Sequence, residues 1–261
     1  MEMIVSAGRG HIGGTLSCVD LLVALYYSGI FHLHPDEEER KRDRFILSKG
    51  HACAALYAIL ADLGYFSPAE LRRFNGKGGL LAGHPDRRIA GIEADTGSLG
   101  HGLGIGIGLA LSAKIDKKEF RTVVLLGDGE CAEGSVWEAA LFAAQHQLGN
   151  LTGIIDHNGL CATGSLRDCL SMEPLEGKWR AFGWDTATID GHSFEAMLAT
   201  FGAHRPRNTG RPLMVIARTV KGKGVSFMEG EALWHHRVPA GDELARAREE
   251  LSLLAEEAAK Q

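Results

Sequence analysis

The sequence lacks a signal peptide and lacks any apolar run long enough to span a membrane. It also lacks a basic excess: the formal net charge is −5, which argues against a nucleic-acid-binding protein. Cysteine is scarce, and the odd number of cysteines, without zinc-site spacing, excludes a disulfide framework. The five are Cys18, Cys53, Cys131, Cys161 and Cys169. Together these absences are typical of a cytoplasmic protein in a reducing compartment.

The composition present is that of a globular chain. The 261 residues are 45% hydrophobic and 23% charged, and they contain no internal repeat or linker. Strand-like and helix-like segments alternate throughout. We therefore expect a single α/β domain over residues 1–261, with a mostly parallel sheet between helices in a three-layer α/β/α arrangement.

The individual elements can be predicted from hydrophobic periodicity, glycines and caps. Strands are expected at 45–47, 123–126, around 154–155, at 186–189 and at 213–217. Helices are expected at 15–27, 52–63, from Pro68, and at 102–114, 135–146, 172–182, 193–201 and 242–260. Residues 36–44 are expected to form a charged loop or short helix, and 3–7 is a short apolar run.

The most informative stretch is the apolar run 123–126, which ends in Gly127-Asp128-Gly129. After one predicted helix, a second apolar run ends in Asn158. This is a βαβ pattern, which joins parallel strands. Because the carboxyl ends of parallel strands share the ligand-binding edge of the sheet, Asp128 and Asn158 should face a common point.

A carboxylate and an amide oxygen are hard ligands that suit Mg²⁺, with Ca²⁺ or Mn²⁺ as alternatives. Glycines beside Asp128 allow close approach of a diphosphate, and the N-terminus of the following helix favours an anion. Taken alone, Gly-Asp-Gly is also a common loop sequence, so an ordinary turn is the competing interpretation.

A rival dinucleotide site begins earlier, at Gly8-Arg9-Gly10-His11-Ile12-Gly13, which has Gly-x-Gly-x-x-Gly spacing before a predicted helix. Asp36 follows at a distance suited to a ribose hydroxyl. The segment before Asp36, residues 30–34, contains two histidines and makes a poor buried strand. This counts against a dinucleotide site, and NAD binding is kept as the rival hypothesis.

Five histidines stand beside glycines or loop breaks instead of inside apolar runs. Imidazole donates hydrogen bonds to hydroxyl and phosphate oxygens and titrates near neutrality, which suits proton transfer. The five are His11, His51, His84, His101 and His235. A lone loop histidine is usually a surface residue, but five beside a metal–diphosphate motif indicate a site.

These residues lie in motifs that resemble a known family. Gly-Asp-Gly followed by Asn resembles the thiamine diphosphate motif, and the full set resembles transketolases in residue order and spans almost the whole chain. The motifs are Gly10-His11-Ile12-Gly13-Gly14, 47–52, Gly83-His84-Pro85, 96–100, 127–129 with Glu133-Gly134, 221–224, and Trp234-His235. The resemblance is to the N-terminal third of a transketolase, most closely to forms split into two polypeptides.

The resemblance implies a cofactor site of thiamine diphosphate with Mg²⁺. It implies metal ligation by Asp128, Asn158 and the backbone carbonyl of Leu160. It implies diphosphate or cofactor contacts from His51, His235, Gly97, Ser98, Leu99 and Gly129. This chain departs from the family pattern at Ile12, which replaces a proline, and at His157, which replaces an acid or Asn.

The same resemblance implies catalytic roles for four residues. His11, His84 and His235 would contact ketose hydroxyls, and His11 and His235 would help move the proton of the C3 hydroxyl. Glu133 resembles the carboxylate that couples two active sites across a subunit interface. Because His236 follows His235, either could align, and the preceding Trp234 favours His235.

The implied function is ketol transfer between sugar phosphates by a hetero-oligomer. A separate C-terminal polypeptide would bring the pyrimidine-binding domain and its activating glutamate, with two copies of each chain. The glycines of 102–108 and the Glu133 loop would lie near subunit contacts, or the glycines would serve internal helix packing. Alternatives are a deoxyxylulose phosphate synthase-like or 2-oxoacid-decarboxylating component, or an inactive binding module.

Overall fold

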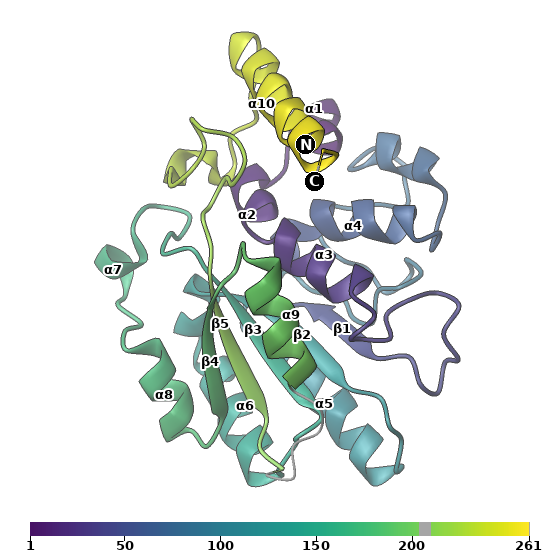
Figure 1. The fold of residues 1–261 in the computed structure, drawn as a ribbon, viewed down its shortest axis with the longest axis vertical. Helices are drawn as coiled ribbons and strands as arrows, with labels where there is room; N and C mark the ends of the chain where they lie inside the picture. The colour runs from purple at the N-terminus through teal and green to yellow at the C-terminus, as the bar shows by residue number, and fades with distance from the viewer. Residues whose placement is uncertain (204–209, 261) are drawn as a thin grey trace.

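The computed structural model describes residues 1–203 and 210–260, which surround one parallel sheet (Figure 1). Its strand order is β1-β2-β3-β5-β4, and every pairing in it is parallel. The strands are β1 (Arg44–Leu47), β2 (Thr122–Gly127), β3 (Leu151–His157), β4 (Asp185–Asp190) and β5 (Leu213–Arg218). The expected α/β class and parallel sheet are confirmed.

Helices cover both faces of the sheet and form a separate apolar core on each. Alternate side chains of a strand point to opposite faces and so enter different cores. On β2, Val123 and Leu125 join one core, and Val124 and Leu126 join the other. The first face carries α1 (Glu2–Ala7), α2 (Ile12–Ser17), α3 (Val19–Tyr27), α4 (Cys53–Asp62) and α9 (Phe194–Ala203). The second carries α5 (Gly102–Ile115), α6 (Gly134–Gln145), α7 (Leu166–Cys169) and α8 (Leu175–Ala181).

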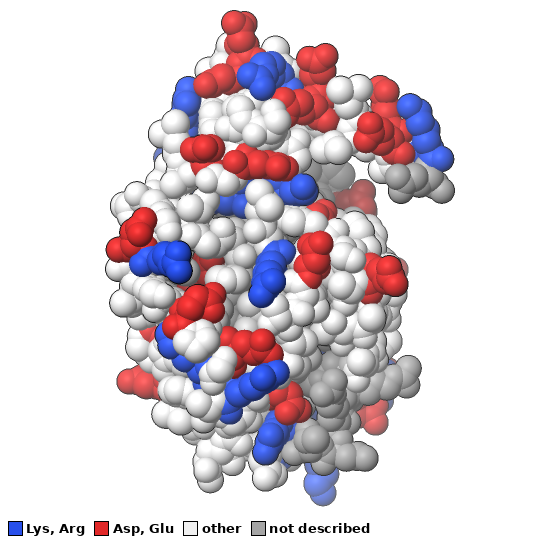
Figure 2. Space-filling view, turned by 60° about the vertical axis from the view of Figure 1, so that its left-hand side comes forward, with Lys and Arg blue, Asp and Glu red and all other residues white. Residues whose placement is uncertain are grey.

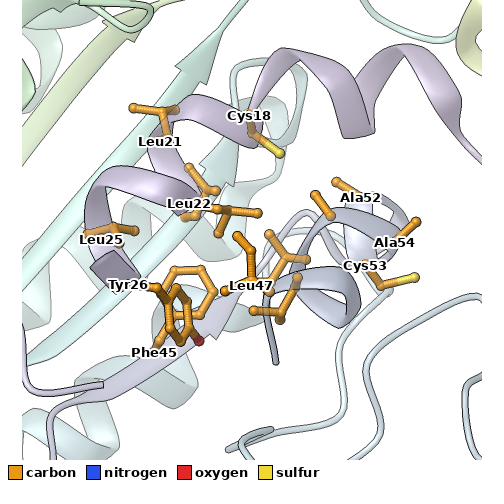
Figure 3. Close-up of a cluster of buried hydrophobic side chains, with 14 of the residues drawn as sticks. Cys18, Leu21, Leu22, Leu25, Tyr26, Phe45, Leu47, Ala52, Cys53 and Ala54 are labelled. Carbon is orange, nitrogen blue, oxygen red and sulfur yellow. The ribbon is translucent and has the colours of Figure 1, made fainter. Parts of the chain in front are cut away.

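A buried apolar cluster joins α3 and α4 to β1 (Figure 3). Leu22, Leu25 and Tyr26 of α3 lie against β1, where the rings of Tyr26 and Phe45 meet edge-on with centroids 5.6 Å apart. Full burial of such side chains stabilises the fold by about 1.5–3 kcal/mol each. The cluster therefore fixes the carboxyl end of β1, from which the segment 48–51 enters the site.

The chain ends pack together on the same side of the molecule (Figure 1). Helix α10 (Asp242–Ala258) buries Ala247, and Arg248 pairs with Glu2 of α1 at 2.9 Å. Acidic and basic side chains are interspersed on the face in Figure 2. Among the described helices, none is both long and apolar enough to cross a membrane.

Two predicted helices and the rival dinucleotide hypothesis need correction. The helix expected at 15–27 is two helices, α2 and α3, which break at Cys18. The helix expected at 172–182 begins only at Leu175, because Pro174 fixes the preceding backbone. The apolar run 3–7 forms part of helix α1, so the glycine motif joins two helices where a dinucleotide site needs a strand and a helix, and the rival dinucleotide hypothesis is wrong.

Short 3₁₀ helices complete the chain. They are η1 (Gly50–Ala52), η2 (Pro68–Arg73), η3 (Gly129–Ala132) and η4 (Ala232–His235). Ser67 caps η2, since its hydroxyl accepts the Ala69 N–H at 3.3 Å. Ser193 likewise caps α9 by accepting the Ala196 N–H at 3.2 Å. The charged segment 36–44 is a loop up to Arg44, where β1 begins.

The glycines of α5 divide into two pairs. A side chain at Gly102 or Gly106 would overlap Ser48 or Val124, so these two glycines let α5 lie directly on the sheet. A Cβ at Gly104 or Gly108 would meet nothing within 4 Å. Internal packing therefore accounts for half of this segment, and the other half faces outward.

We predict opposite effects on stability at these two kinds of position. Gly104→Ala should raise the free energy of unfolding by up to about 1 kcal/mol, because it removes the backbone entropy cost of a helical glycine. Gly106→Ala should lower it by about 1–3 kcal/mol through overlap with Val124. Urea denaturation of both variants measures the difference, and equal stability of the two would contradict this packing.

Candidate active site

A pocket of about 480 Å³ lies at the carboxyl ends of β2 and β3. The strand register pairs Gly127 with Asp156, so the residues just beyond, Asp128 and Asn158, reach the same edge. The expected common point is therefore present. The predicted site residues that line the pocket are His11, His51, His84, Gly97, Leu99, Asp128, Gly129, Asn158, Leu160 and His235.

Two oxygen-bearing side chains, Asp128 and Asn158, gather at this edge beside Leu160. Asp128 is 2% exposed, and its two carboxylate oxygens accept the N–H groups of Gly129 at 2.7 Å and Gly159 at 2.6 Å. The Asn158 side-chain oxygen accepts the Leu160 N–H at 3.1 Å. These bonds fix the oxygens, and carboxylate and amide oxygens carry further lone pairs that can bind a ligand.

The His157 ring lies between the carboxylates of Asp128 and Glu173. Its Nδ1 lies 3.3 Å from Asp128 Oδ2, and its Nε2 lies 3.2 Å from Glu173 Oε1. The interaction with Asp128 raises the pKa of His157 above its usual value, although burial opposes this. The residue at which this sequence departs from the family pattern thus adds a contact to Asp128.

Four histidines converge on the opposite side of the pocket. The His11 ring lies 5.2 Å from that of His51, 6.1 Å from His84 and 5.3 Å from His235. Burial, reinforced by neighbouring cations, lowers the pKa of His11 to about 4 and that of His235 to about 3. Burial also lowers the pKa values of His51 and His84. The imidazoles are therefore neutral at pH 7 and able to accept protons.

His235, and not the exposed His236, lines the pocket. The nitrogens of His11, His235 and His236 lie within 4.8 Å of one another, a spacing open to a transition metal. Lysine charges nearby oppose a cation there, since they already lower the pKa values of His11 and His235. This side of the pocket suits anions and hydroxyl groups.

A buried ion pair forms the floor of the pocket. Lys49 and Asp156, 2% and 0% exposed, bind each other directly. The Lys49 ammonium also donates to the Gly14 carbonyl at 3.0 Å, and Asp156 accepts the hydroxyls of Ser17 and Thr219. The ion pair raises the pKa of Lys49 against the effect of burial and lowers that of Asp156.

A second buried lysine carries a charge without a carboxylate partner among the described contacts. Lys221 is 2% exposed, and its ammonium donates to the carbonyls of Cys161 at 3.0 Å and Leu160 at 3.4 Å. Burial, and then repulsion from Lys49, lowers its pKa. Lys221 is thus placed to attract an anion. The sequence analysis identified the motif 221–224 but assigned no role to this lysine.

Glu130 is another residue without a sequence-based role. Its buried carboxylate accepts the Ser48 hydroxyl, the Gly100 N–H at 2.9 Å and the Gly127 N–H at 3.0 Å. Burial raises its pKa above the usual value. The side chain fastens β1, the 96–100 loop and β2 together. Only its place directly after Gly-Asp-Gly could have signalled this.

Two predicted residues and one additional histidine lie outside the pocket. Ser98 is in the 96–100 loop, where its hydroxyl lies 3.4 Å from His101 Nδ1. His101 is exposed and occupies the N-cap position of α5 without a capping hydrogen bond from its side chain. Glu133 is exposed at the N-cap of α6, packed beside Gly100. Glu133 therefore does not line the pocket.

The Lys221 charge leads to a measurable prediction. Lys221→Met should raise the pKa of His235, because the ammonium is the largest electrostatic cause of its depression after burial. Lys223→Met is the matched control, since Lys223 is half-exposed and pairs with Glu229 at 3.4 Å. Histidine NMR titrations report the pKa values, and an unchanged His235 in Lys221→Met would refute this electrostatic assignment.

Comparisons with known proteins agree with this geometry. Residues 1–258 match the family described as transketolase, thiamine diphosphate binding domain. The chain is 44% identical over 253 residues to an apulose-4-phosphate transketolase subunit of Phocaeicola vulgatus, covering 97% of this chain and 89% of that protein. It is 37% identical to the transketolase of Homo sapiens, covering 90% of this chain and 37% of the human protein.

The fold agrees as well. The crystal structure of transketolase from Campylobacter jejuni superimposes with a TM-score of 0.88 at 28% identity, covering 96% of this chain and 40% of that one. The chain thus spans most of the Phocaeicola vulgatus protein and less than half of the longer transketolases. It belongs to the transketolase family and corresponds to that family's thiamine diphosphate binding domain.

Proposed function

We propose that this chain holds Mg²⁺ and thiamine diphosphate and, with a second polypeptide, transfers a two-carbon ketol unit between sugar phosphates. The observation that carries the proposal is the convergence of Asp128, Asn158 and Leu160 with Lys221 and the histidines on one pocket. The name of the Phocaeicola vulgatus relative, which specifies apulose-4-phosphate, supports a sugar-phosphate substrate. We further propose that residues 1–261 act as one diphosphate-binding domain.

The oxygen donors fit the metal. Carboxylate, amide and backbone carbonyl oxygens are the ligands Mg²⁺ prefers, and it usually completes its shell with water and ligand phosphates. Asp128, Asn158 and the Leu160 carbonyl would hold it; Ca²⁺ and Mn²⁺ suit the same oxygens. Two backbone N–H groups hold the Asp128 oxygens in place at the proposed site.

The cationic and glycine-rich side of the pocket fits the diphosphate. The Lys221 ammonium offers charge, and His51 and His235 offer ring N–H groups. Gly97, which has φ of +135° and no room for a Cβ beside His84, lets backbone approach a ligand closely. Ser98, Leu99 and Gly129 would line the rest. The bound cofactor supplies the carbanion chemistry of carbon–carbon cleavage.

The histidines orient the sugar and move its proton. Neutral His11 and His235 can accept the C3 hydroxyl proton as the adjacent carbon–carbon bond breaks, and return it when the acceptor adds. His84, whose backbone carbonyl accepts the Tyr57 hydroxyl at 2.7 Å, would contact a further hydroxyl of the ketose. Contacts from these three histidines would hold the sugar in the orientation that the reaction needs.

The proposed partner brings the pyrimidine-binding domain and its activating glutamate. Two copies of each chain would form the enzyme, and Glu133 would couple the active sites at the contact. The outward position of Glu133 and the open faces of Gly104 and Gly108 support this assembly. The five cysteines, all free thiols, are consistent with the proposed cytoplasmic location.

Reconstitution tests the proposal. The chain alone should be a folded oligomer without ketol-transfer activity, because the activating glutamate lies on the partner. Activity with a ketose phosphate donor should appear when a partner with the pyrimidine-binding domain and Mg²⁺–thiamine diphosphate is added. Asp128→Ala should stay inactive with that partner. Robust activity of the chain alone, or of Asp128→Ala, would overturn the proposal.

Mutants of the histidines separate chemistry from binding. With the partner present, His235→Ala and His11→Ala should lower kcat by about 10²- to 10⁴-fold while changing cofactor affinity far less, because these groups move a proton. His34→Ala is the matched control, since His34 is exposed and does not line the pocket. Normal turnover by both mutants would show that these roles are wrong.

A further inference from the structure

The loop that follows Asn158 carries two cysteines whose sulfur atoms nearly touch. Cys161 Sγ and Cys169 Sγ lie 2.8 Å apart, roughly 0.8 Å more than the bond length of a disulfide. Both are free thiols, one half-buried and one exposed, and both line the cofactor pocket. The proposed function uses neither side chain.

Backbone hydrogen bonds hold the segments that carry the two thiols close together. Leu160 and Ser165 form an antiparallel bridge, and the Cys161 N–H donates to the Gly164 carbonyl at 2.9 Å. Helix α7 then turns the chain back, with the Cys169 N–H bonded to the Ser165 carbonyl at 3.2 Å. The approach of the sulfurs therefore follows from the path of the chain and not from side-chain rotamers alone.

The other three cysteines are shielded. Cys18, Cys53 and Cys131 are at most 1% exposed, and Figure 3 shows Cys18 and Cys53 among the apolar side chains of α3 and α4. Burial raises the pKa of each of these thiols, which leaves little reactive thiolate. An oxidant in solution would therefore meet Cys161 and Cys169 first.

We propose that Cys161 and Cys169 are a redox modification site that forms a reversible intrachain disulfide on exposure to hydrogen peroxide. One thiolate attacks the peroxide, so that a sulfur–oxygen bond forms, the oxygen–oxygen bond breaks, and the departing hydroxide takes up a proton as water. The second thiol attacks the resulting sulfenic acid, and the sulfur–sulfur bond forms as a second water leaves. Two thiols and one peroxide thus give one disulfide and two waters, and a dithiol reverses the reaction.

The consequence for the pocket rests on the proposed function. Cys161 directly follows Leu160, the proposed carbonyl ligand, and its own carbonyl accepts the Lys221 ammonium at 3.0 Å. A cross-link would tether the loop close to the geometry described here. Because less ordering would then remain to be done on binding, the oxidised chain should bind Mg²⁺–thiamine diphosphate several-fold more tightly.

Peptide mapping tests the disulfide directly. The full chain is treated with hydrogen peroxide, remaining thiols are blocked with a maleimide, and trypsin is added without reductant. Because Arg167 lies between the two cysteines, cleavage there leaves two peptides that stay joined only through the disulfide. We expect this linked pair, with a mass loss of two hydrogens, and its disappearance on addition of dithiothreitol.

Serine variants provide the controls. Cys161→Ser and Cys169→Ser should abolish the linked peptides, whereas Cys131→Ser, whose thiol is buried on the same tryptic fragment as Cys161, should retain them. Maleimide on both Cys161 and Cys169 after peroxide treatment, or a link that survives Cys169→Ser, would overturn the proposal.

Two further readouts address the tethered loop. Hydrogen exchange of the amides from Gly159 to Cys169 should slow on oxidation, and unchanged exchange would overturn the tethering. Calorimetry with Mg²⁺–thiamine diphosphate should show the tighter binding, and weaker binding by the oxidised chain would overturn that part of the inference. Absence of binding in both redox forms would instead count against the proposed function and leave the disulfide intact.

Discussion

The site depends on one buried ion pair, Lys49 with Asp156. Removing two charges from water is costly, and the attraction between them repays this cost only when the remaining hydrogen-bonding groups are satisfied. Here the Gly14 carbonyl completes the shell of the lysine, and the hydroxyls of Ser17 and Thr219 complete that of the aspartate. The pair therefore joins the carboxyl ends of β1, β3 and β5 to helix α2. Loss of either partner would leave a buried charge beneath the cofactor pocket.

Above this floor the pocket combines two kinds of chemistry. Asp128 and Asn158 present side-chain oxygens that backbone N–H groups hold in place, and the Leu160 carbonyl beside them accepts the Lys221 ammonium at 3.4 Å. Lys221 and neutral imidazoles line the same pocket, and burial depresses their pKa values. Because a metal and a diphosphate carry opposite charges, this mixed lining fits the two together better than it fits either alone.

The sequence predicted most of this arrangement because its signals were local. The Gly-Asp-Gly and Asn motifs, their parallel crossover and the loop histidines all led to the same edge of the sheet. The missed residues have no local signature: Asp156 lies inside an apolar strand, and Lys49 and Lys221 acquire their roles only from burial against distant segments. The missed break at Cys18 likewise depends on tertiary packing, which overrides local propensity. The late start of α8 follows from Pro174, which is a local signal.

The central claim is that the carboxyl edge of β2 and β3 is the metal–diphosphate site. Anomalous diffraction from crystals of the chain with thiamine diphosphate and Mn²⁺ in place of Mg²⁺ tests it most directly. The account predicts one strong manganese peak, bound by Asp128, Asn158 and the Leu160 carbonyl and bridging to the diphosphate. A peak among His11, His235 and His236 instead, or cofactor density without metal at Asp128, would contradict it.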